Sequence, residues 1–466
     1  MELRPPDDDP ALNDPVPPSR TRRAVNVAIL LLLIVSMVFL AYVSGRGVIA
    51  PPEAPGPTPR PSVDEATTEG RRLVLIDAAG RLATADPAGD DIVRYGDTSV
   101  VYSFPAWSPD GSYIAALGRG RDGTAIHVFE VRGSTESAAG VAILYESADE
   151  PPFYLYWSPD SRQVAFLTSA ADGLSLRIAP ADATAPATVV REGSPLYWAW
   201  TMDDARLLVH SGSGADEFFG AVTADGVPTE TSPIDSTGFR APAVTTDGRF
   251  RAYVAPGEGT PARIMIEEVD GPVRQALDIF GAAAINFGPA TSELAFIAPS
   301  AQTRDASVPI GPLRSLDALT GDVRTLFAGP TVAFFWAPDG RTIAALELAT
   351  PGNNPIAATS GIQLAAAEMA AIAPLAVGLA LRLTFVDVAS ASVTAGRSVL
   401  VSDTFSGQVI PFFDQYALSH RFWSADGGSI VLPVVASDGT EELQVIPADG
   451  SEPRSLGPGV SASWHP

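Results

Sequence analysis

The stretch FPAWSPDGSYIAAL, residues 104–117, introduces a pattern that recurs along the whole chain: a tryptophan, a turn and an apolar run. Ser108, Pro109 and Asp110, followed by Gly111, are residue types that suit successive positions of a type I turn. The run YIAAL after the turn has the composition of a strand buried on both faces. The stretch therefore predicts one strand, a tight corner and a neighbouring antiparallel strand.

Eight copies of this corner align along the chain. They are AWSPDG at Trp107, YWSPDS at Trp157, AWTMDD at Trp200, AVTTDG at Val244, NFGPAT at Phe287, FWAPDG at Trp336, FWSADG at Trp423 and SWHP at Trp464. Six of the seven spacings between the copies are 41 to 50 residues, near the period of four-stranded propeller blades. We predict an all-β fold, a β-propeller of four-stranded blades. Eight corners indicate eight blades, with seven as the alternative if one corner is cryptic.

The last copy, Trp464 to Pro466, has no second strand after its corner. An innermost strand with an unpaired edge is unfavourable, so we expect it to complete a blade that begins elsewhere. The segment from Arg71 to Gly96 supplies strand-like runs without a tryptophan corner of its own. The N-terminal and C-terminal segments are therefore predicted to pair and to close the ring.

The sequence WSPDG followed by an I-A-A or I-A-F strand resembles the WD40-like (PD40) repeat of TolB-type β-propellers. The same repeat occurs in the propeller module of prolyl-oligopeptidase-type peptidases. The resemblance covers roughly residues 71–466 and implies the fold more specifically than the function. Two corners depart from it: Val244 replaces the tryptophan in the fourth, and FGPATSE at Phe287 lacks both the tryptophan and the Asp-Gly pair.

The corner residues are interpreted as structural. We expect the large rings to pack between adjacent blades, and the aspartates to occupy the same turn position in separate blades rather than one carboxylate cluster. These residues are Trp107, Asp110, Trp157, Asp160, Trp200, Trp336, Asp339, Trp423, Asp426 and Trp464.

One spacing, from Trp336 to Trp423, is 87 residues and indicates an insertion at about 349–380. Its Ala-rich part, Gly361 to Ala373, favours helix. A second transmembrane segment is the weaker reading, because Glu368, Pro374 and Arg382 interrupt the apolar run. Two roles stay open for this insertion: a partner-binding element, or a helix packed under the ring.

The first seventy residues predict a location. Residues 1–23 are acidic and Pro-rich at first, as in a disordered cytoplasmic tail, and end with Arg20, Arg22 and Arg23. Residues 24–43 carry no charge and are long enough for a transmembrane helix, and residues 44–70 form a Pro-rich linker. Basic residues on the N-terminal side predict a single-pass protein of the cell membrane with an extracytoplasmic propeller. A cleaved signal peptide is the alternative.

Composition excludes several classes. The formal net charge is −24 with an isoelectric point near 4.4, and no basic patch is present, which argues against a nucleic-acid partner. The chain has no cysteine, hence no disulfide framework and no thiol nucleophile. No metal-ligand spacing appears, and the four histidines are scattered, so neither a metal nor a cofactor is predicted.

No catalytic residues are predicted, because the chain lacks a G-x-S-x-G elbow and an α/β-hydrolase segment. Residues just before the corners begin the innermost strands and can face the central channel. Two readings stay open for these residues: ordinary residues of the rim, or a site for a polar ligand or an acidic peptide end at the channel mouth. The candidates are Tyr154, Tyr197, Arg240, Asn286, His420 and Arg421. The leading hypothesis is a non-catalytic module that binds a protein or peptide partner at the cell surface. The alternatives are a hydrolase or lyase acting at the channel mouth, and a scaffold acting through 349–380.

Overall fold

The computed structural model describes most of the unit Val63–Pro466. The described residues are 72–131, 141–170, 173–201, 206–212, 217–229, 241–255, 262–269, 271–281, 283–299, 308–349 and 379–466. The predicted tail, transmembrane helix and linker (1–23, 24–43, 44–70) lie outside them, as does nearly all of the predicted insertion at 349–380. Within the described ranges, no helix has the length and apolarity needed to cross a membrane.

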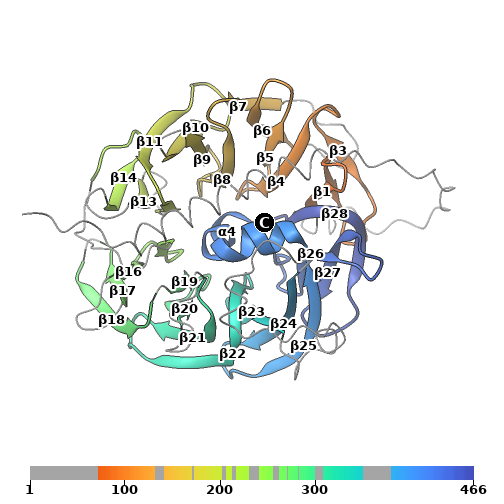
Figure 1. Ribbon diagram of the computed structural model, residues 1–466. Helices are drawn as coiled ribbons and strands as arrows, with labels where there is room; N and C mark the ends of the chain where they lie inside the picture. Colours follow the sequence, from red (N-terminus) through yellow and green to blue (C-terminus); the bar gives the residue numbers. More distant parts are fainter. Residues whose placement is uncertain are drawn as a thin grey trace, which may run out of the picture. The chain divides into compact units, whose positions relative to one another are not determined.

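Four separate antiparallel sheets follow one another along the chain (Figure 1). The first holds β4 (Val101–Trp107), β5 (Tyr113–Arg119), β6 (Thr124–Glu130) and β7 (Val141–Ser147). The second holds β8 (Pro152–Trp157), β9 (Gln163–Ala170), β10 (Gly173–Pro180) and β11 (Thr188–Gly193). The third holds β12 (Leu196–Trp200), β13 (Arg206–Ser211) and β14 (Phe218–Thr223). The fourth holds β15 (Ala243–Val244), β16 (Phe250–Ala255), β17 (Ala262–Glu268) and β18 (Val273–Ile279).

The remaining strands form one continuous sheet of 13 strands. In sheet order they are β19 (Ala284–Phe287), β20 (Glu293–Ile297), β21 (Gly311–Asp317), β22 (Val323–Trp336), β23 (Thr342–Leu348), β24 (Leu379–Asp387), β25 (Val393–Val401), β26 (Ser429–Val435), β27 (Glu441–Pro447), β28 (Arg454–Trp464), β1 (Leu73–Asp77), β2 (Leu82–Ala85) and β3 (Val93–Tyr95). The sheet is continuous because β22 and β28 each pair with the preceding strand through one half and with the following strand through the other. Only one residue pair joins β25 to β26.

The two ends of the folded unit pair with each other. β1 runs antiparallel to the second half of β28, with Leu73 opposite Trp464 and Ile76 opposite Ser461. This confirms the prediction that the last tryptophan corner is completed by the N-terminal segment. The unit therefore closes on itself through main-chain hydrogen bonds, and this strand edge is not left exposed.

The second strand of each sheet is buried on both faces. In β5, residues Ile114 to Leu117 are all buried, and the equivalent run Val164 to Leu167 in β9 is buried too. A strand that stands in a single half-exposed sheet alternates between buried and exposed residues. Continuous burial therefore means that each sheet is covered on both faces, as the apolar runs after the corners predict.

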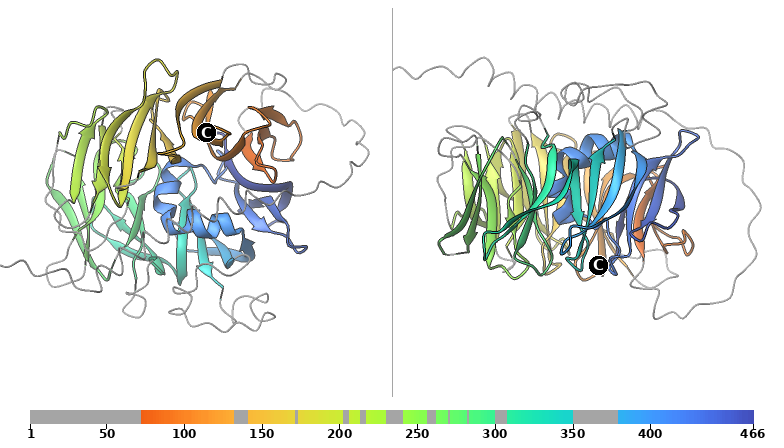
Figure 2. Two further views of the ribbon diagram at one scale, coloured as in Figure 1. Left: turned by 45° about the horizontal axis from the view of Figure 1, so that its top comes forward. Right: turned by 90° about the horizontal axis from the view of Figure 1, so that it is seen from below.

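Five corner tryptophans link their own corner to the preceding corner of the ring. Their indole N–H groups donate to the carbonyl just before that preceding corner: Trp107 to Ser463 (3.3 Å), Trp157 to Ala106 (3.1 Å), Trp200 to Tyr156 (3.4 Å), Trp336 to Asn286 (3.3 Å) and Trp423 to Phe335 (2.9 Å). The bond from Trp107 to Ser463 joins the first sheet to the end of the chain. The sheets consequently form a ring, seen along its axis in Figure 1 and from the side in Figure 2.

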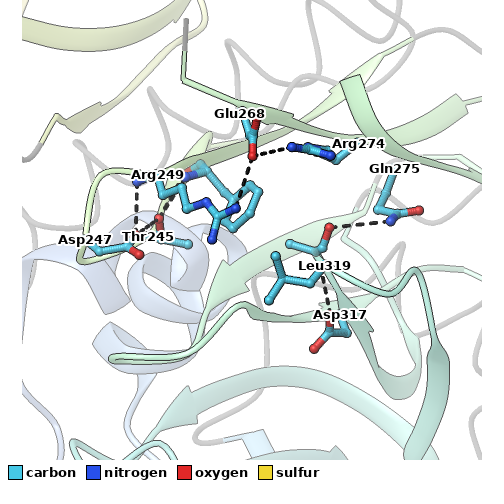
Figure 3. A network of polar contacts seen from close by, with 10 residues as sticks. Thr245, Asp247, Arg249, Glu268, Arg274, Gln275, Asp317 and Leu319 are labelled. Atoms are coloured by element: carbon cyan, nitrogen blue, oxygen red, sulfur yellow. Dashed lines mark hydrogen bonds and ion pairs between the residues drawn. The ribbon is translucent and has the colours of Figure 1, made fainter. Parts of the chain in front are cut away.

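The corner aspartates hold their own turns. The Ser108 hydroxyl lies 2.6 Å from Asp110 Oδ1, which also accepts the backbone N–H of Ser112. The same arrangement recurs at Thr245 and Asp247, where the N–H of Arg249 is the second donor (Figure 3). Asp160, Asp339 and Asp426 each accept the N–H two residues later. These carboxylates therefore serve separate turns, as expected from their position in the repeat.

A helical segment lies inside the ring between β25 and Trp423. It comprises the π-helical turn η5 (Phe405–Val409), the 3₁₀ turn η6 (Ile410–Phe412) and the α-helix α4 (Phe413–Ser419). In Figure 1, α4 lies at the centre of the ring with sheets on all sides. The sequence interpretation assigned the extra length of this repeat to 349–380 alone and missed this second element.

Candidate binding site on the ring axis

The helix α4 packs against innermost strands from several sheets. It contacts β8, β12, β19 and β22. Phe413 is fully buried, and its ring centroid lies 5.1 Å from that of Phe334 and 6.2 Å from that of Phe335, both on β22. Burial of aromatic side chains on this scale supplies a large apolar contribution to docking. The helix therefore occupies the axis as part of the hydrophobic core.

Gln415 attaches α4 to the inner edge of β12. Its Nε2 donates to the carbonyl of Trp198 at 2.8 Å, and its Oε1 accepts the N–H of Trp198 at 3.1 Å. The inner edge of an innermost strand has no neighbouring strand to pair with, so these backbone groups need other partners. The side-chain amide replaces the missing strand at this residue. Both Gln415 and Trp198 are buried, which makes the pairing costly to lose.

A chain of three polar side chains fixes the end of α4. Tyr154 Oη lies 2.7 Å from Ser419 Oγ, which lies 2.7 Å from His420 Nδ1. Tyr154 Oη is also 2.9 Å from the carbonyl of Gln415. Burial raises the pKa of Tyr154 well above its ordinary value and lowers the pKa of His420 to about 4. At neutral pH the phenol therefore keeps its proton and the imidazole is uncharged.

Ser419 and His420 have the spacing of a nucleophile and its base, yet their surroundings argue for a structural role. A general base works best with a pKa near the operating pH, and the pKa of His420 is far lower. The imidazole packs among the rings of Phe104, Tyr154 and Tyr416, at centroid distances of 6.4, 6.4 and 5.3 Å. Substrate would have to displace α4 to reach it, so the Tyr154, Ser419 and His420 chain is interpreted as a latch for the helix.

The other end of the axis presents polar groups that α4 does not use. Tyr156 lies two residues beyond Tyr154 on β8, next to the corner at Trp157, and is half-buried. Arg421 directly follows His420 and is exposed. The charge of Arg421 acts on Tyr156: burial raises the pKa of Tyr156, and the guanidinium partly offsets that rise. This electrostatic effect acts between parts of the ring that are not neighbours.

The candidate residues inferred from sequence fall into three groups. Tyr154 and His420 come together on the axis, but they pack against α4. Tyr197 is half-buried and lies beside the helical segment, with its ring centroid 6.3 Å from that of Phe412 in η6. Asn286 and Arg421 lie toward the corners, and Arg240 is outside the described residues. The sequence analysis missed three residues near the axis: Gln415, Ser419 and Tyr156. Of these, only Tyr156 could have been found from the repeat, because it directly precedes the corner tryptophan Trp157.

Two further polar clusters lie away from the axis. A surface network joins Arg249 and Arg274 to Glu268 (3.2 and 2.6 Å), on the fourth sheet (Figure 3). A buried cluster joins Glu267 to Arg251 (2.8 Å) and to the Tyr253 hydroxyl (2.5 Å). In both, the opposite charges or hydrogen-bonding groups satisfy one another. Among the described residues, no group of three or more His, Asp or Glu side chains is arranged to hold a metal ion.

Comparison with known proteins identifies the fold. No family model matches the sequence, and no curated protein matches it significantly. Among solved structures, the dihydro-heme d1 dehydrogenase NirN, in complex with DHE, aligns with a TM-score of 0.51 at 12% identity, covering 88% of this chain and 77% of that one. TolB from Acinetobacter baumannii aligns at 17% identity with a TM-score of 0.33, covering 55% and 65%. At 12% identity the likeness to NirN concerns the fold alone, and it agrees with a β-propeller.

Proposed function

We propose that this chain is a membrane-anchored β-propeller of eight four-stranded blades that binds a protein or peptide partner outside the cytoplasm, without catalysis. The strand pairing supports this blade number, although the third sheet has three strands among the described residues. The four separate sheets count as four blades, and the long sheet divides at the middle of β22, between β25 and β26, and at the middle of β28 into four more. Eight corners in the sequence agree with this division.

The observation that carries the binding function is the difference between the two ends of the axis. At one end, α4 fills the ring, and its polar groups are engaged with Tyr154 and Trp198. The side chains of Arg421 and Asn286, which lie nearer the corners, have no hydrogen bond or ion pair with any described residue. Polar groups held on a rigid fold without internal partners are suited to recognise another molecule.

The anchor is inferred from the sequence. Residues 24–43 form an uncharged apolar run behind three arginines, which favours a span with the propeller on the far side. We assign the proposed binding function to the propeller.

Site-specific photo-crosslinking in cells tests the proposal. The full anchored chain carries a photoreactive phenylalanine derivative in place of Tyr156, or, as the matched control, in place of Phe280, which is 49% exposed beyond β18 and away from the axis. We expect one protein to be captured from position 156 and not from position 280. Equal capture from both positions, or no capture from position 156, contradicts binding at this end of the axis.

A further inference from the structure

His420 lies at the end of α4 without a charged partner. It is 6% exposed, and its backbone N–H donates to the carbonyl of Tyr416 at 2.8 Å. Its ring packs among those of Phe104, Tyr154 and Tyr416. Nδ1 lies 2.7 Å from Ser419 Oγ, and no described residue forms an ion pair with the imidazole. A positive charge on this ring would therefore be buried without compensation.

The titratable groups on the surrounding elements do not balance such a charge. The phenols are uncharged in neutral and acidic solution, because tyrosine titrates near pH 10. The one carboxyl group on α4, that of Asp414, is in the first turn, at the opposite end of the helix from His420. Arg421 follows His420 directly and is itself cationic. Strand β19 and residues 332–336 of β22 carry no titratable side chain. On β4, β8, β12, α4 and the residue after His420, the titratable groups are Tyr102, Tyr154, Tyr156, Tyr197, Asp414, Tyr416 and Arg421.

Phe104 on β4 has a strained backbone beside the same imidazole. Its φ is +48°, a value that a bulky residue rarely adopts, and the pairing of β4 with β5 is interrupted between Ser103 and Ala106. The Phe104 ring centroid lies 5.7 Å from that of Tyr416 on α4. Undocking of α4 would remove this packing and allow Phe104 to return to an ordinary strand conformation. The docked state therefore carries a local strain that undocking relieves.

The helical segment, residues 403–420, is fixed at both ends and contributes no strand to any sheet. Before it, the N–H of Ser402 donates to the carbonyl of Pro433 at 3.1 Å, and after it the N–H of Arg421 donates to Ser463 Oγ at 3.1 Å. None of η5, η6 and α4 has a side-chain cap at its N-terminal end, and α4 has only seven residues. A helix this short depends on its docking contacts. Loss of these contacts would free the segment between two fixed points and leave the strand pairing intact.

We propose that residues 403–420 form a plug of the ring axis that acid releases: protonation of His420 separates α4 from the innermost strands, and the plug moves out between its two attachments. An imidazolium carries an N–H on both nitrogens, so Nδ1 cannot accept a hydrogen bond from the Ser419 hydroxyl. In the released state water solvates the charge, and the backbone of Trp198 and the hydroxyl of Tyr154 lose the contacts with α4 that cover them. The plug controls access to the axis, and its release requires no partner.

Acid favours release because the released state binds the proton more tightly. Burial lowers the pKa of His420 to about 4 in the docked state, and the backbone of Phe104 offsets only part of this, whereas a solvated histidine has a pKa near 6.5. As the pH falls from about 6.5 to about 4, the released state gains a proton that the docked state does not bind. The ratio of released to docked plug therefore rises by up to about tenfold per pH unit, and by about 70-fold between pH 7.5 and pH 4.5.

Hydrogen–deuterium exchange of the full chain in detergent, corrected for the pH dependence of the intrinsic exchange rate, tests the plug. We expect the protection of the amides of 413–420 to fall about 70-fold between pH 7.5 and pH 4.5, while the amides of β5 and β9 stay protected. Constant protection in 413–420 overturns the proposal. An equal loss in 413–420, β5 and β9 also overturns it, because the whole ring then unfolds together.

Substitutions assign the effect to His420. In His420→Phe, which cannot be protonated, residues 413–420 are expected to stay protected at both pH values. The matched control is His127→Phe, which removes another buried histidine, packed on Phe129 in β6, and should keep the pH dependence of the parent chain. Persistence of the pH dependence in His420→Phe, or its loss in His127→Phe, overturns the assignment to His420. Unfolding midpoints at pH 7.5 show whether the variants are folded, and the exchange of the parent chain decides the proposal if they are not. No partner is present in this experiment, so its outcome is independent of capture at position 156.

Discussion

Gln415 pairs through its side-chain amide with both backbone polar groups of Trp198, at 2.8 and 3.1 Å. The amide thus supplies the hydrogen bonds that a neighbouring strand would otherwise make with this innermost strand. This relationship explains why a short helix is stable inside a ring of sheets. The inner edges carry backbone donors and acceptors, and a helix satisfies its own backbone internally. A side chain that offers one donor and one acceptor is therefore needed to join them.

Replacing Gln415 with alanine is expected to lower the free energy of unfolding by about 2–4 kcal/mol, because two buried backbone groups of Trp198 lose their partners. Denaturant unfolding of the purified protein measures this change. The control is Gln275→Ala, which removes only one 3.4 Å contact to the carbonyl of Ala318 and should cost less than about 0.5 kcal/mol. Equal losses in the two variants would show that the amide does not stabilise the docked helix.

His420 makes stability depend on pH. The pKa of His420 is lowered by burial to about 4, whereas an exposed histidine has a pKa near 6.5. As the pH falls below about 6.5, His420 binds a proton in the unfolded chain but not in the folded chain. The free energy of unfolding therefore decreases until about pH 4. The full contribution is about 3 kcal/mol. Below pH 4 this contribution does not decrease further.

The comparison of the parent chain with His420→Phe between pH 7 and pH 4 isolates this effect, because other groups titrate in the same range. His127 acts in the same direction, since burial lowers its pKa, whereas Glu347 and Glu441 act in the opposite direction, since burial raises theirs. These contributions are common to both chains and cancel in the difference. A stability difference that stays constant over this pH range contradicts the prediction.

The corner tryptophans should contribute unequally. Trp423 donates a 2.9 Å hydrogen bond to Phe335, whereas the indole nitrogen of Trp464 is buried and has no hydrogen-bond partner in the described residues. Trp423→Phe removes the donor from a carbonyl and is expected to cost about 1–2 kcal/mol more than Trp464→Phe, in which only packing changes. Thermal or denaturant unfolding of the two variants gives the difference. A larger loss for Trp464→Phe would mean that the indole bonds do not hold neighbouring sheets together.

The ring was predictable because the residues that form each corner are close together in the sequence. Trp107, Ser108 and Asp110 lie within four residues, and their bonds close one corner and reach one neighbouring sheet. Eight corners align on this pattern, with departures at Val244 and Phe287, so the repeat itself predicts the architecture. Even the pairing of β1 with β28 followed from the incomplete corner at Trp464.

The helix on the axis was not predictable in this way, because its partners are remote. Gln415 forms hydrogen bonds with Trp198 and Tyr154, which lie 217 and 261 residues away in the sequence. No local sequence pattern predicts such contacts. The position of Tyr154 and His420 in the repeat predicted that they face the axis. It did not predict that α4 covers them. The only signal was length: the spacing of 87 residues exceeds one period by more than an insertion of about 30 residues explains.

The membrane anchor is tested by deleting residues 24–43 and comparing the distribution of the two chains after cell fractionation. We expect the full chain in the membrane pellet, resistant to extraction by high salt, because transferring twenty uncharged residues out of the bilayer is strongly unfavourable. The deleted chain should be in the soluble fraction and should retain the same unfolding midpoint, since no described strand involves these residues. The mass of the mature full chain decides between an anchor and a cleaved signal peptide. A mass that lacks the first 40 to 50 residues, with the remaining chain released from membranes, would overturn the anchor and leave the propeller free outside the cytoplasm.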